Sequence, residues 1–80
     1  MTIELLFFGR AKDIAGARSI HMDVPDNASV STLRALLSER YAALDTGLQY
    51  AVAINEVYAE NHQLIQSGDV VAILPPVSGG

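Results

Sequence analysis

The last six residues, Pro75-Pro76-Val77-Ser78-Gly79-Gly80, have types and an order that suit chemistry at a carboxylate. A free carboxylate is a poor acyl donor, but adenylation converts it to a mixed anhydride that a sulfur or nitrogen nucleophile can attack. Glycine lacks Cβ and tolerates close approach, so a carboxylate on Gly80 can enter a partner's narrow pocket. The prolines fix φ and stiffen the base of this arm. The pattern predicts a reactive Gly80 and leaves the nucleophile open; the alternative is a frayed end.

Other catalytic chemistry has little support in the side chains. The 80 residues include no cysteine, which excludes disulfides and thiolate metal sites. His21 and His62 are expected to be solvated surface residues, and the carboxylates show no spacing typical of acid–base catalysis. Gly9 and Gly16 do not form a phosphate-binding loop. We therefore expect no metal site and no independent catalytic site in this chain.

Charge and hydropathy restrict the partners. Acidic residues outnumber basic ones nine to five, for a formal charge of -4. The basic residues are scattered among the acids, which disfavours nucleic-acid binding. They are Arg10, Lys12, Arg18, Arg34 and Arg40. No apolar run approaches the ~18 residues of a membrane span. The first residues lack the features of a signal peptide, so we expect a soluble, cytoplasmic protein.

The elements that must position the arm follow from periodicity and turn signals. Five strands are predicted, at residues 3–8, 19–24, 50–54, 57–58 and 70–74. Residues 9–16 are predicted to form a connector with one helical turn around Lys12 to Ala15, closed by Gly16. Ser29 is the expected N-cap of an amphipathic helix that ends near residues 40–42. Asn55-Glu56 is the expected tight turn between two of the strands.

This order of elements predicts an α+β fold of the β-grasp type. A mixed sheet of about five strands would be covered on one face by one main helix, with the first and last strands parallel at its centre. The apolar run 70–74 suggests burial on both faces of the last strand. Residues 1–74 would form the domain and residues 75–80 an extended tail.

Several of these segments together resemble those of a known protein family. The chain resembles the small, sulfur-carrying subunits of molybdopterin synthase, which are ubiquitin-like proteins, over essentially its whole length. The residues that carry this resemblance are Leu6-Phe7-Phe8, Ser29-Val30, Leu33-Arg34, Ala53-Ile54-Asn55 and, most specifically, the block from Leu64 to Gly80. A Gly-Gly end alone is shared by many ubiquitin-like carriers. Gly-Asp, an apolar strand and Pro-Pro-Val-Ser-Gly-Gly together are specific.

The resemblance implies a function for the Gly80 carboxylate. An adenylyltransferase related to ubiquitin-activating enzymes would use ATP to form an acyl-adenylate, and sulfur from a donor protein would convert it to a thiocarboxylate. The arm, residues 75–80, would then enter the large synthase subunit. There it would donate sulfur to cyclic pyranopterin monophosphate for the dithiolene of the molybdenum cofactor. The resemblance also implies a heterotetramer, and no permanently bound cofactor in this chain.

The sequence also predicts a docking surface. Leu6 and Phe8 share a sheet face with Glu4, away from the expected helix, and such an apolar face suggests a partner. We expect Phe8, Tyr58 and Leu74 to contact that partner, with Lys12 at the rim. Alternatively, Phe8 and Leu74 fold over the sheet edge. Three other functions stay open: a carrier for the thiamine pathway, a protein modifier, and a non-covalent β-grasp interaction module.

Overall fold

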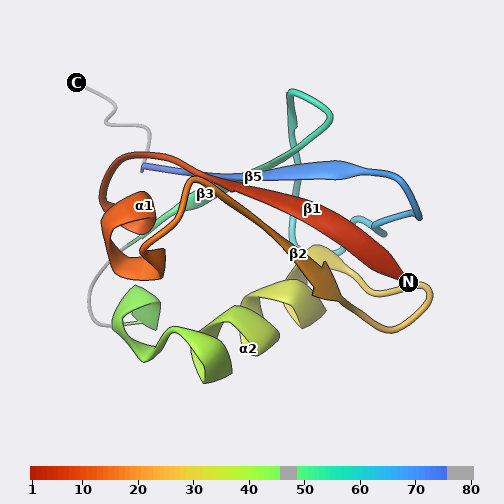
Figure 1. Cartoon of the computed structure of the whole chain (residues 1–80). Helices are drawn as coiled ribbons and strands as arrows, with labels where there is room; N and C mark the ends of the chain where they lie inside the picture. The colour runs from red at the N-terminus through yellow and green to blue at the C-terminus, as the bar shows by residue number, and fades with distance from the viewer. Residues whose placement is uncertain (46–48, 76–80) are drawn as a thin grey trace.

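A five-stranded mixed sheet forms the centre of the molecule (Figure 1). The computed structural model describes residues 1–45 and 49–75. The elements are β1 (Thr2–Phe7), α1 (Gly9–Ala15), β2 (Ser19–Asp23), α2 (Val30–Arg40), the 3₁₀ helix η1 (Ala42–Asp45), β3 (Ala51–Ile54), β4 (Val57–Tyr58) and β5 (Val70–Leu74). The strand order is β2-β1-β5-β3-β4, with β1 and β5 parallel and the other pairs antiparallel. The predicted α+β architecture with a central parallel pair is confirmed.

The core lies between the sheet and α2, which runs beneath one sheet face (Figure 1). Side chains alternate along a strand, so Ile3, Leu5 and Phe7 of β1 all turn to this face and are buried. β5 adds Val71 and Ile73, and α2 buries a stripe of Val30, Leu33 and Leu37 against them. Among the described residues no helix packs on the opposite sheet face, since α2 lies on this one.

The ends of α2 are fixed by local bonds that agree with the sequence prediction. The Ser29 Oγ accepts a hydrogen bond from the Thr32 N–H at 3.2 Å, as an N-cap does. At the other end the Tyr41 N–H donates to the Leu37 carbonyl at 2.7 Å. The Tyr41 ring then packs edge-on against Phe7, with ring centroids 5.8 Å apart. These contacts join the helix to β1 at the end where β1 leaves the sheet.

The connector after β1 is more helical than predicted. Residues 9–15 form α1, about two turns instead of one, and Gly16 closes it with φ 72° and an N–H bond to the Lys12 carbonyl. The cause is tertiary packing: Ala11 is buried in the core, and Ile14 packs against the core. These contacts stabilise the extra turn, and a segment that begins with glycine gives no local signal of them. The short helix η1, which buries Leu44, is a further element that the sequence pattern did not predict.

The prediction that β5 is buried on both faces is wrong. Val71 and Ile73 are fully buried, whereas Val70, Ala72 and Leu74 are only half-buried. The strand is apolar on both faces, but α2 covers only one of them.

Within residues 1–45 and 49–75, no helix is long and apolar enough to cross a membrane.

Candidate functional site

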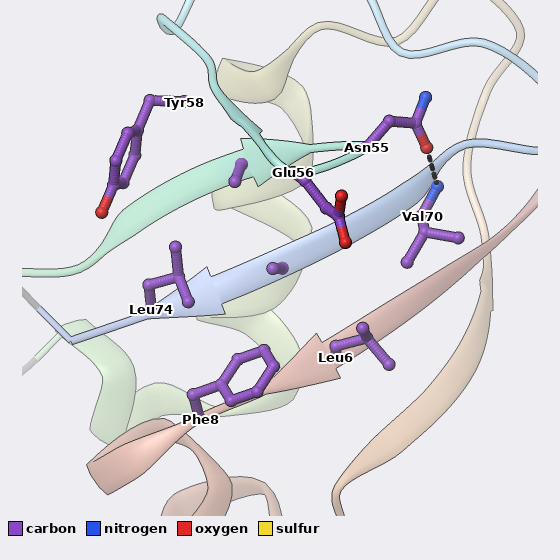
Figure 2. Close-up of a pocket in the computed structure, with 9 residues that line it drawn as sticks. Leu6, Phe8, Asn55, Glu56, Tyr58, Val70 and Leu74 are labelled. Carbon is purple, nitrogen blue, oxygen red and sulfur yellow. Dashed lines mark hydrogen bonds between the residues drawn. The ribbon is translucent and has the colours of Figure 1, made fainter.

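The uncovered sheet face holds an open apolar groove of about 550 Å³ (Figure 2). Strands β1, β5 and β3 and the β3–β4 hairpin line it. Its apolar lining comprises Leu6, Phe8, Ala53, Tyr58, Val70, Ala72 and Leu74. The Phe8 and Tyr58 side chains remain 44% and 63% exposed, respectively, which is high for aromatic residues. A groove with exposed aromatic walls is typical of a surface that a partner covers.

The strand register explains why this face is hollow. Leu6 of β1 lies beside Ala72 of β5, and Ala72 lies beside Ala53 of β3, which is in turn paired with Tyr58 of β4. Across the sheet, this row has a large side chain at each end and two small alanine side chains between them. The two alanines form a shallow floor, while Leu6 and Tyr58 rise as walls. This alignment joins residues from four strands, so it depends on pairing and not on any one segment.

One end of the groove is the root of the arm. The Phe8 N–H donates to the Ile73 carbonyl at 3.1 Å, which holds the end of β1 against the end of β5. Gly9 follows with φ 57°, and an ideal Cβ built on it would lie 2.9 Å from Cγ of Pro75. Because real Cβ atoms essentially never lie closer than 3.0 Å to such a neighbour, a side chain at position 9 would force the Pro75 ring or its surroundings to shift. The first residue of the arm thus leaves the sheet beside Phe8 and Leu74.

The other end of the groove is a turn fixed by side-chain bonds. Asn55 and Glu56 have φ of 50° and 71°, as a tight hairpin turn with two left-handed residues requires. The Val70 N–H donates to the Asn55 Oδ1 at 3.0 Å (Figure 2), and the Asn55 Nδ2 donates to Asp69 at 2.9 Å. The Asn55 N–H also donates to the Val70 carbonyl. Asn55 therefore ties the hairpin to the start of β5.

The structure brings together three of the four predicted interface residues. Phe8, Tyr58 and Leu74 all line the groove. Lys12 does not line it; it lies with Arg18 around an adjacent concavity that shares Leu6 and Phe8 with the groove. Whether these residues contact a partner stays a prediction.

Two polar lining residues, Asn55 and Glu56, were predicted only as a turn. The predicted turn could have indicated their place in the groove, because a tight turn directly after β3 lies next to β5, the strand that pairs with β3. Of the predicted arm, Pro75 is described and exposed, while residues Pro76, Val77, Ser78, Gly79 and Gly80 lie outside the described residues. In the described ranges no three His, Asp or Glu residues are grouped as metal ligands.

Comparisons with known proteins agree with the resemblance drawn from the sequence. A family model described as the ThiS family matches residues 5–80. The molybdopterin synthase sulfur carrier subunit of Chlamydomonas reinhardtii is 32% identical over 83 residues, an alignment that covers all of both chains. This match, with the family model, spans the domain and the arm together.

Solved structures show the same fold. A chain in a complex of subunits 1 and 2 of the molybdopterin-converting factor from Helicobacter pylori superimposes with a TM-score of 0.70, at 30% identity and full coverage of both chains. The small archaeal modifier protein 1 of Haloferax volcanii superimposes with a TM-score of 0.83, at 25% identity, covering 95% of this chain and 98% of that one. The ubiquitin-like β-grasp assignment is confirmed by these neighbours. The chain therefore belongs to the ThiS family, among relatives named molybdopterin synthase sulfur carrier subunits.

Proposed function

We propose that this chain is the sulfur carrier subunit of a molybdopterin synthase, and that Gly80 is the residue that carries the sulfur. The observation that carries the proposal is the end-to-end similarity to a relative of that name, arm included. The geometry supports it, because β5 leads the chain out of an exposed apolar groove at Pro75. A partner that covers the groove would lie next to Pro75, the first residue of the arm.

The proposed chemistry takes place on the arm and in its partners. An adenylyltransferase uses ATP to form the Gly80 acyl-adenylate and releases pyrophosphate. Hydrosulfide released from a sulfur donor protein then attacks the acyl carbon, and AMP leaves, which gives a thiocarboxylate on Gly80. A thiocarboxylate is largely ionised and nucleophilic at neutral pH, so it can deliver sulfur to cyclic pyranopterin monophosphate in the large subunit. This chain supplies no catalytic side chain of its own in this scheme, and a cytoplasmic location remains a prediction of the sequence.

The proposed docking surface is the groove. Phe8, Tyr58 and Leu74 provide exposed apolar area at or near the root of the arm, and such aromatic and aliphatic anchors contribute most to protein interfaces. Lys12 would lie at the rim, outside the apolar contact. The Helicobacter pylori complex, in which subunit 1 is bound to subunit 2, supports a large-subunit partner. The proposed assembly is a heterotetramer of two carriers and two large subunits.

The test of the carrier function is the intact mass of the protein purified from its own host with nothing appended after Gly80. We expect a species heavier by one exchange of oxygen for sulfur, formed in greater yield with the cognate adenylyltransferase, ATP and a sulfur source. A variant that lacks Gly80 is the control, because its reactive carbon is displaced by about 3.5 Å. Absence of the heavier species under all these conditions would contradict the proposal.

Docking is tested by Leu74→Glu, which places a carboxylate in the apolar groove. We expect the affinity for the large subunit to fall at least about 100-fold, since an unpaired charge would be buried in the interface. Leu64→Glu is the matched control: Leu64 is 54% exposed and does not line the groove. If both variants fold and bind like the parent chain, the groove is not the docking surface.

A second candidate, a protein modifier, has one observation in its favour: the structural similarity to the small archaeal modifier protein 1. That function predicts isopeptide bonds between Gly80 and lysines of other proteins, visible as conjugates by mass spectrometry of digests. A non-covalent interaction module predicts instead that removal of Gly80 leaves function intact. The carrier proposal predicts complete loss in that variant.

A further inference from the structure

The charges around the groove are not evenly distributed along its length. Parallel pairing of β1 with β5 sets a direction: Leu6 lies beside Ala72, and Phe7 beside Ile73, so both strands end at the root of the arm. The Asn55–Glu56 turn lies at the opposite end, because Ile54 is paired with Val71 near the start of β5. The groove therefore has one end at the root of the arm and the other at the Asn55–Glu56 turn.

The arm end is basic. Lys12 of α1 and Arg18, which precedes β2, line the concavity that adjoins the groove at Phe8. Arg18 is held at this end, since its carbonyl accepts from the Phe7 N–H at 2.8 Å. Both side chains are exposed, and neither forms an ion pair with another described residue. Asp13, also on α1, lines neither the groove nor the concavity.

The opposite end is acidic. Glu56 is the one charged residue among the described residues that line the groove, and Figure 2 shows its side chain extending from the turn toward β5. Glu4 shares this sheet face with Leu6 and is paired with Val70, at the same end. Within the described part of the chain neither carboxylate has a cationic partner. Glu56 also occupies a left-handed position, φ 71°, that glycine adopts at lower cost.

We infer that this polarity sets the orientation of the docked protein. The inference rests on the proposed docking of a protein on the groove. The occupant is a protein surface with apolar side chains for the groove, a lysine or arginine that pairs with Glu56, and an aspartate or glutamate that faces Lys12 and Arg18. Complementary charges at the two ends of an apolar patch favour one orientation and penalise its reverse. The favoured orientation directs the partner's acidic end toward the exit of the arm.

The inference is tested by binding of the full chain to the large subunit of molybdopterin synthase from the same organism. We expect Glu56→Gln to weaken binding about 3- to 10-fold and Glu56→Lys to weaken it further, because the reversal replaces attraction with repulsion. Arg18→Gln should also weaken binding. Each effect should shrink as salt is raised, since salt screens exposed charges. The matched controls are Glu39→Lys, on α2 away from the groove, and Arg10→Gln, on α1 but outside both concavities.

The outcomes separate the inference from the docking proposal. If Leu74→Glu abolishes binding while Glu56→Lys and Arg18→Gln bind like their controls, the groove is the docking surface but its polarity does not orient the partner. If Leu74→Glu also binds normally, docking on the groove itself is wrong. Sedimentation of the chain alone is the third measurement. A dimer that Glu56→Lys dissociates would make a second copy, in antiparallel orientation, the occupant and would overturn the inference.

Discussion

Gly9 is a single residue on which the geometry of the arm depends. It is the first residue of α1, it has a positive φ, and its missing Cβ leaves the space that the Pro75 ring occupies. The position is therefore constrained twice, once by backbone conformation and once by a neighbour across the fold. The sequence shows only a glycine after an apolar strand, so neither constraint could be predicted from it. The contact with Pro75 joins residues more than sixty positions apart in the sequence.

We predict that Gly9→Ala lowers the free energy of unfolding by about 2–3 kcal/mol, one part from the left-handed backbone and one from overpacking against Pro75. Gly16→Ala is the matched control, because Gly16 also has a positive φ but no described atom lies within 4 Å of its ideal Cβ. That variant should lose only about 1 kcal/mol. Urea denaturation measures both values. Equal losses in the two variants would show that Pro75 does not pack on Gly9.

At the scale of elements, the β3–β4 hairpin and β5 are joined through Asn55. Its side chain accepts from the Val70 N–H and donates to Asp69, and Asp69 in turn accepts from the Gln66 N–H at 2.8 Å. These bonds connect the turn, the start of β5 and the segment that leads into it. The acidic end of the groove is held in place by this connection.

We predict that Asn55→Ala destabilises the fold by about 2 kcal/mol, from two lost hydrogen bonds and a left-handed φ of 50° that alanine disfavours. Asn55→Gly loses the same bonds but tolerates the φ, so it should cost about 1 kcal/mol less. In both variants the Val70 amide proton should exchange faster with solvent, which NMR detects at that residue. An unchanged Val70 exchange rate would contradict the proposed role of Asn55.

Sequence periodicity predicted the elements whose signals are local. The alternation around Leu5, the Ser29 cap and the Asn55-Glu56 turn each lie within one segment, and the structure contains all three features. Features that depend on pairing could not be predicted in this way. The groove floor needs Ala53 beside Ala72, from strands that the sequence does not align. The burial of Ala11, which extends α1, likewise depends on the core formed by distant elements.

For the whole molecule, the described residues form a small domain with an apolar groove on one sheet face and with Pro75, the first residue of the predicted arm, at the end of that groove. α2 occupies one side of the sheet, and the groove occupies the other, at whose end Pro75 begins the arm. Both proposed partners, the adenylyltransferase and the large subunit, must receive the same Gly80. Because Pro75, the first residue of the arm, lies beside the groove, we expect each proposed partner to approach from this side and the carrier to bind one of them at a time.

We predict that the two partners compete for the carrier. Unlabelled large subunit should displace a fluorescently labelled carrier from the adenylyltransferase, with a midpoint that rises in proportion to the concentration of the adenylyltransferase. The label belongs on the α2 face, for example at Glu39→Cys, since that residue is exposed and the chain has no other cysteine. Leu74→Glu should weaken binding to both partners, whereas Leu64→Glu should weaken neither. A stable complex of all three proteins in size-exclusion chromatography would contradict the prediction, because it would require a second docking surface that does not overlap the groove.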